Sequence, residues 1–125
     1  MLNTAEVIAF VATTNPERAR RFYETVLGLA LVADEPFALV FDANGVVLRV
    51  AKVPKLAPAE HTILGWNVAD LRATVRALTD RGVVFERYDG LAQDETGVWR
   101  SPGGAEVAWF KDPDGNVLSL TQRAG

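Results

Sequence analysis

The chain repeats one succession of strands and helix, and this repeat limits the folds that it can adopt. Residues 7–12 and 63–68 are strand-like runs that each lead into a helix whose apolar residues recur at helical spacing. A shift of 55 residues lays Ile8 on Ile63 and Asn15 on Asp70. Both halves of the chain are therefore predicted to begin with a strand followed by an amphipathic helix.

The predicted helices carry start and stop signals at matching places. Asn15, followed by Pro16, and Asp70 are good N-cap residues because their side-chain oxygens accept hydrogen bonds from the first turn. Gly28 and Gly82 are predicted to end the helices. The strand-like runs that follow them are residues 29–33 and 83–88.

Each half closes on a predicted hairpin. A Gly-containing turn, 42–45 or 112–115, separates an apolar run from a final strand, 46–51 or 116–121. We therefore predict an α+β fold of two β-α-β-β-β modules, residues 5–52 and 61–123. The linker 53–60 contains Pro54 and Pro58 and shows no periodicity. The alternative is a small α+β protein that shows two such runs by chance.

Composition excludes several classes of partner. The chain has 125 residues, the length of one domain, and a net charge of -3, without the basic excess that nucleic-acid binding requires. No apolar stretch is long enough to span a bilayer, and the N-terminus lacks a positively charged leader region. Because the chain has no cysteine, a reducing compartment is the simplest home. We predict a cytoplasmic protein with no nucleic-acid or membrane partner.

Two motifs carry a family resemblance. The helix ending Phe22-Tyr23-Glu24-Thr25-Val26-Leu27-Gly28 and the later run Trp109-Phe110-Lys111-Asp112-Pro113-Asp114-Gly115-Asn116 resemble the vicinal oxygen chelate superfamily. This superfamily includes glyoxalase I, extradiol dioxygenases and bleomycin resistance proteins. The resemblance implies two paired modules whose curved mixed sheets form a cup, often in a dimer, so that a homodimer is expected.

The resemblance also implies where a metal would bind. Metal-dependent members carry ligands on the first and last strand of each module, and these positions here hold Ile8, Arg49, Ile63 and Ser119. Isoleucine has no donor atom, arginine is a permanent cation and an unaided serine hydroxyl is a poor ligand. We therefore expect no metal and no cofactor. His61 and Glu6 lie two residues before the isoleucines, so a shifted site on the same strand face stays open as an alternative.

Strand alternation then gives the predicted pocket lining. Side chains two residues apart on a strand share a face, and Trp109 is turned toward the cup because Phe110 is assigned to the core. The segment 89–104, which contains Trp99, is expected to flank the mouth. No catalytic residue is identified. The predicted ligand-binding residues are Ile8, Phe10, Arg49, Ile63, Asn67, Trp109, Ser119 and Thr121.

Three functional hypotheses follow. The first is metal-independent binding of a small hydrophobic or aromatic molecule, as in the bleomycin resistance branch that the chain resembles. The second is a lyase, isomerase or dioxygenase with a non-standard or metal-free active site that uses Arg49, His61 or Ser119. The third is a domain that acts through protein contacts and fills the cup with its own side chains.

Overall fold

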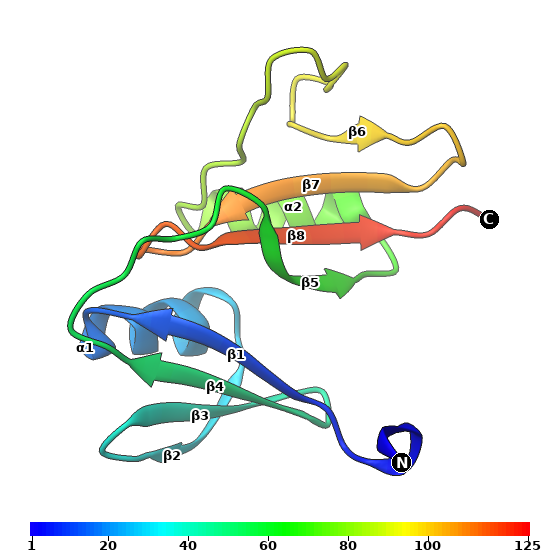
Figure 1. Cartoon of the computed structure of the whole chain (residues 1–125). Helices are drawn as coiled ribbons and strands as arrows, with labels where there is room; N and C mark the ends of the chain where they lie inside the picture. The colour runs from blue at the N-terminus through cyan, green and yellow to red at the C-terminus, as the bar shows by residue number, and fades with distance from the viewer. The chain divides into compact units, whose positions relative to one another are not determined.

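The computed structural model describes all 125 residues. The chain divides into two compact units, Met1–Pro58 and Ala59–Gly125. Each unit holds one four-stranded mixed sheet and one main helical segment (Figure 1). The predicted α+β fold class is confirmed.

The first unit has strand order β1-β4-β3-β2. β1 runs parallel to β4, whereas the β2–β3 and β3–β4 pairs are antiparallel. Its elements are η1 (Leu2–Thr4), β1 (Ile8–Thr13), α1 (Pro16–Arg20), η2 (Arg21–Val26), β2 (Ala30–Asp34), β3 (Ala38–Ala43) and β4 (Val46–Lys52).

The second unit repeats this topology with strand order β5-β8-β7-β6. β5 runs parallel to β8, and the other two pairs are antiparallel. Its elements are β5 (Thr62–Asn67), α2 (Leu71–Asp80), β6 (Trp99–Arg100), β7 (Glu106–Lys111) and β8 (Val117–Gln122). In both units, therefore, the first and last strands are the parallel pair.

The helices begin and end where the sequence predicts. The Asn15 Oδ1 accepts a hydrogen bond from the Arg18 N–H at 3.1 Å, and the Asp70 Oδ1 accepts one from the Ala73 N–H at 3.1 Å. Gly28 then adopts a positive φ of 80° just beyond the first helical segment.

The two hairpin turns both reverse the chain, but different groups stabilise them. Asn44 and Gly45 form a two-residue turn with φ of 53° and 88°, as a type I′ hairpin requires. The second turn is organised by Asp112, whose Oδ1 accepts hydrogen bonds from the N–H groups of Asp114 and Asn116, both at 2.9 Å. The Asn116 amide closes the loop by donating to the Asp112 Oδ2 at 2.8 Å.

In each unit the helix covers one face of the sheet and forms the core with it. Tyr23 is fully buried and its ring centroid lies 5.9 Å from that of Phe41 on β3. Leu71 on α2 and Phe110 on β7 are likewise fully buried, and Figure 1 shows α2 behind β7 and β8. The prediction that Phe110 is a core residue is confirmed, and Phe41 holds the matching buried position in the first unit.

The first helix differs from the regular one that the apolar spacing predicts. After the five residues of α1 it widens into the π-helical η2, and the Leu27 N–H donates to the Phe22 carbonyl five residues earlier at 2.9 Å. The wider turn places the adjacent side chains of Phe22 and Tyr23 both in the core. A regular helix would point adjacent side chains in more divergent directions.

The predicted strand 83–88 is wrong. Only an isolated bridge between Phe85 and Phe110 joins this segment to β7, and β6 pairs with the far end of β7 instead. The Gln93 side chain instead hydrogen-bonds to the backbone of this segment and of the turn beside it. Its Nε2 donates to the carbonyls of Glu86 and Gly97, and its Oε1 accepts from the Tyr88 N–H. These bonds replace the ladder that a neighbouring strand would supply.

None of the helices in the structure is both long and apolar enough to cross a membrane.

Candidate functional site

One face of the first sheet is not covered by its helix. On β1 and β4, Ile8 lies opposite Val47 and Phe10 lies opposite Arg49. Side chains paired in this way share a face, whereas the alternate residues Val11, Leu48 and Val50 are buried toward the helix. Ile8 is 51% exposed and Phe10 is 59% exposed. The structure thus brings the predicted residues Ile8, Phe10 and Arg49 onto one open apolar face.

Arg49 has a partner that the sequence did not reveal. Its Nη1 lies 3.1 Å from the Glu35 Oε1, and both side chains are partly exposed. Glu35 follows the end of β2 and reaches Arg49 only because β2 and β4 flank β3 in the sheet. Strand alternation could not have found this pair, since it depends on the order of the strands.

The second sheet also has an open face, and four predicted residues lie on it. Gly65, Ser119 and Trp109 form one cross-strand row on β5, β8 and β7. Asn67 and Thr121 belong to the next row, which continues to Trp99 on β6 through Val107. Ser119, Asn67, Thr121 and Trp109 are therefore placed on a common face, and their role as ligand contacts stays a prediction.

Ile63 occupies an irregular position. The register of β5 against β8 shifts between Thr62 and Leu64, so that Ile63 is an extra residue with no direct partner. Its side chain is 37% exposed. The repeat predicted Ile63 as the counterpart of Ile8, and the bulge removes the regular pairing that Ile8 has.

Three aromatic rings gather on the open side of the second sheet. The ring centroids of Trp99 and Trp109 lie 6.0 Å apart, and Tyr88 stands edge-on to Trp109 at 5.5 Å. Partial burial, helped by the negative charge of Glu86, raises the pKa of the Tyr88 phenol. The sequence predicts that Trp99 flanks the mouth of the pocket. It predicts no such place for Tyr88, because residue 88 falls in the predicted strand 83–88.

His61 and Glu6, the donors of the alternative site, lie outside the regular strands. Both residues precede their strands, which begin at Thr62 and Ile8, and both are exposed. The alternation argument therefore does not extend to them. No group of three or more histidine, cysteine, aspartate or glutamate side chains that could hold a metal ion occurs in the structure.

The four positions implied by the resemblance do not fit a metal ion. Ile8 and Ile63 offer no donor atom, and Arg49 carries a positive charge already paired with Glu35. Only the Ser119 hydroxyl has an oxygen, and a neutral hydroxyl alone is a weak ligand.

Comparison with known families identifies the fold. A family model described as the Glyoxalase/Bleomycin resistance protein/Dioxygenase superfamily matches residues 5–120. The chain belongs to this superfamily. The resemblance based on the Phe22-Tyr23 and Asp112–Asn116 motifs is thereby confirmed. None of the curated proteins matches the chain.

Solved structures of the superfamily share this fold at low sequence identity. A lactoylglutathione lyase from Agrobacterium tumefaciens is 16% identical with a TM-score of 0.73, covering 95% of this chain and 93% of its own. The glyoxalase family protein from Enterococcus faecalis is 17% identical with a TM-score of 0.75, covering 96% and 99%. A superfamily member from Sphaerobacter thermophilus is 22% identical with a TM-score of 0.72, covering 94% and 97%. At these identities the likeness concerns the fold alone.

Proposed function

We propose that the protein binds a small hydrophobic or aromatic molecule without a metal ion. The observation that carries this proposal is the set of side chains at the four positions where metal-dependent members hold their ligands: Ile8, Arg49, Ile63 and Ser119. A divalent cation needs several oxygen or nitrogen donors, and this set supplies one hydroxyl. The chemistry of the superfamily that depends on a bound metal therefore has no support in these residues.

The exposed apolar side chains favour a hydrophobic ligand. Ile8 and Phe10 lie two residues apart on the open face of the first sheet, and more than half of each side chain is exposed. Trp99 and Trp109 present partly exposed rings on the open face of the second. Covering about 100 Å² of such surface contributes about 2.5 kcal/mol to binding.

The polar groups favour a ligand without net charge. Glu35 already balances the positive charge of Arg49, so an anionic group on the ligand is not required. Asn67, Ser119 and Thr121 add neutral donors and acceptors along one face of the second sheet. A flat, neutral aromatic molecule with a few hydrogen-bonding groups meets these conditions best.

The proposal is tested by a binding titration with 1-naphthol, followed by tryptophan fluorescence before and after dialysis against EDTA. We expect saturable quenching that EDTA leaves unchanged, and a loss of affinity of up to about tenfold in Trp109→Ala. Trp66→Phe is the matched control, because Trp66 pairs with Leu120 in the alternate row of the same sheet and belongs to its helix-covered face. A stoichiometric divalent metal in the purified protein, or loss of binding in EDTA, overturns metal independence.

We also propose that the protein is a cytoplasmic homodimer. Dimers are frequent among the proteins that the chain resembles, and the absence of cysteine suits a reducing compartment. Native mass spectrometry of the freshly purified protein measures the subunit count together with any co-purified ligand. A monomer at micromolar concentration contradicts the proposed assembly.

A further inference from the structure

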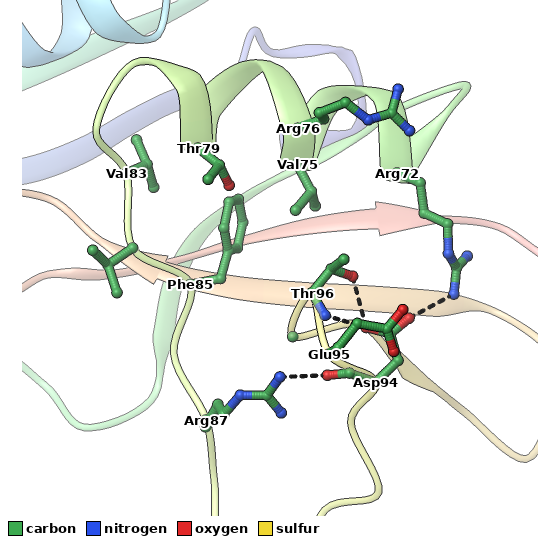
Figure 2. A pocket seen from close by; sticks show the side chains of 12 residues that line it. Arg72, Val75, Arg76, Thr79, Val83, Phe85, Arg87, Asp94, Glu95 and Thr96 are labelled. Carbon is green, nitrogen blue, oxygen red and sulfur yellow. Dashed lines mark hydrogen bonds and ion pairs between the residues drawn. The ribbon is translucent and has the colours of Figure 1, made fainter.

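A hollow lies on the other side of the second sheet, away from Ser119 and Trp109. It has a volume of about 610 Å³ and is bounded by α2, the segment 83–87 and the turn 94–97 (Figure 2). Phe85 forms its floor together with Val75, and the Phe85 ring packs on the core residue Phe110 at 5.5 Å. This hollow therefore belongs to the helix-covered side, whereas the proposed ligand face is the opposite one.

The hollow exists because the edge of this sheet is incomplete. In the first unit, β2 pairs with β3 over most of its length, whereas the matching segment of the second unit forms a single isolated bridge with β7, at Phe85. The turn at residues 94–97 approaches from the other side, and Gly97 makes this possible. A Cβ atom at Gly97 would lie 3.2 Å from the Phe85 Cβ, and the backbone there has a φ of 94°.

The floor of the hollow is apolar and its mouth carries an exposed apolar side chain. Val75 and Val83 are buried at 3% and 7% exposure. Val84 lines the hollow although it is 77% exposed. The exposed Val84 and the partly exposed Phe85 ring give a ligand apolar surface to cover.

The rim is lined by charged side chains, and Arg72 is balanced by two carboxylates, those of Asp94 and Glu106. Three arginines, Arg72, Arg76 and Arg87, face two acidic residues, Asp94 and Glu95. Asp94 is already engaged, because it accepts from the Arg72 Nη2 at 2.9 Å and from the Thr96 hydroxyl at 2.6 Å. Its negative charge is therefore already neutralised by Arg72.

Two of the arginines keep donors for a ligand. The Arg87 Nη2 donates to the Asp94 backbone carbonyl at 2.6 Å, which uses one of the five guanidinium N–H groups (Figure 2). Arg76 is exposed one turn beyond Arg72 on α2 and shares neither of the carboxylates that bind Arg72. A guanidinium group binds a carboxylate by paired, charge-assisted hydrogen bonds.

We propose that this hollow is a second binding site, for a small amphipathic carboxylate. Its apolar body lies against Phe85, Val75 and Val84, and its carboxylate is held at the rim by Arg87 or Arg76. The site is separate from the proposed neutral-aromatic site, because the two lie on opposite faces of one sheet.

The test is an NMR titration of the whole protein with 3-phenylpropionate, followed through the backbone amides. We expect shifts in residues 75–87 and 94–97, and weaker shifts with the neutral 3-phenylpropionamide. Val84→Glu places a repelling charge at the mouth and should weaken binding about fivefold, while the matched Val84→Lys should keep or improve it. Both changes fall on an exposed side chain, so the fold tolerates them.

Three results would overturn the second site: equal binding of the acid and the amide, equal affinity of the two Val84 variants, or shifts confined to residues of the open face such as Trp109 and Ser119. The last result would leave the aromatic-ligand proposal standing. Conversely, failure of 1-naphthol to bind while 3-phenylpropionate shifts the α2 amides would remove the first site alone.

Discussion

Gly65 on β5 lies directly opposite Ser119 on β8, and the missing side chain of the glycine is what leaves room for the Ser119 hydroxyl. A Cβ atom at residue 65 would lie 2.5 Å from the Ser119 Oγ. The matching pair in the first unit is Phe10 opposite Arg49. The same cross-strand position thus carries a large aromatic and a cation on one sheet, and a glycine and a hydroxyl on the other.

Gly65→Ala is expected to lower the free energy of unfolding by about 1 kcal/mol, because the added methyl group forces the Ser119 hydroxyl to move. In the Ser119→Ala background the same change should cost less, since the atom that clashes is gone. Urea unfolding of the wild type, both single variants and the double variant measures the coupling. An equal cost in both backgrounds contradicts the contact.

Asp112→Ala is expected to destabilise the protein by about 2–3 kcal/mol, because it removes a buried carboxylate that accepts three hydrogen bonds. Two come from the backbone N–H groups of Asp114 and Asn116, and the third comes from the side-chain amide of Asn116. Asp42→Ala is the matched control in the first hairpin. Asp42 is exposed and accepts one hydrogen bond from the Gly45 N–H at 2.7 Å, so its removal should cost less than about 1 kcal/mol. Similar losses in thermal or urea unfolding would refute the difference between the two turns.

Asp94→Asn should show a stability loss that depends on pH. Partial burial works to raise the pKa of Asp94, but hydrogen bonds from Thr96, Val98 and Arg72 outweigh it and lower the pKa to about 2, against 3.8 for a free side chain. A folded pKa below the unfolded one stabilises the protein above pH 4, and this contribution disappears as the pH falls toward 2. At pH 7 the loss should be about 1 kcal/mol, since solvent screens the partly exposed ion pair.

Urea unfolding at pH 7 and at steps between pH 4 and 2 gives this profile for the wild type and Asp94→Asn. Glu95→Gln removes the neighbouring exposed charge and is expected to have little effect at any pH. A stability difference between the wild type and Asp94→Asn that stays constant down to pH 2 would show that the carboxylate charge plays no part.

Glu35→Gln should change the ligand preference of the first sheet. Without its carboxylate partner, Arg49 has free donors on the face that carries Phe10, so affinity for 1-naphthoate should rise relative to 1-naphthol, by up to about fivefold. Glu17→Gln serves as the control, because it makes the same substitution at an exposed residue in the first turn of α1. Unchanged selectivity in Glu35→Gln would show that Glu35 does not tune this face.

Local chemistry explains why much of the fold was predictable. Asn15 and Asp70 cap their helices through atoms three residues away, and Asp112 organises a loop of a few residues. Alternation likewise put Ile8, Phe10 and Arg49 on one face, because the period of a strand is fixed by its pleat. These are properties of short stretches of chain, and the internal repeat showed them twice.

The tertiary structure alone decided the features that join distant segments. The segment 83–88 has the composition of a strand, but its backbone forms hydrogen bonds with the Gln93 side chain. The edge of the sheet is therefore left open. The pairing of Glu35 with Arg49 and of Tyr88 with Trp109 depends on which strands and loops become neighbours. The amino-acid sequence by itself therefore determined the repeated strands, caps and turns, since their bonds are local. The charge balance of the first face, the aromatic cluster and the hollow beside α2 arose only from the packing of segments that are far apart along the chain.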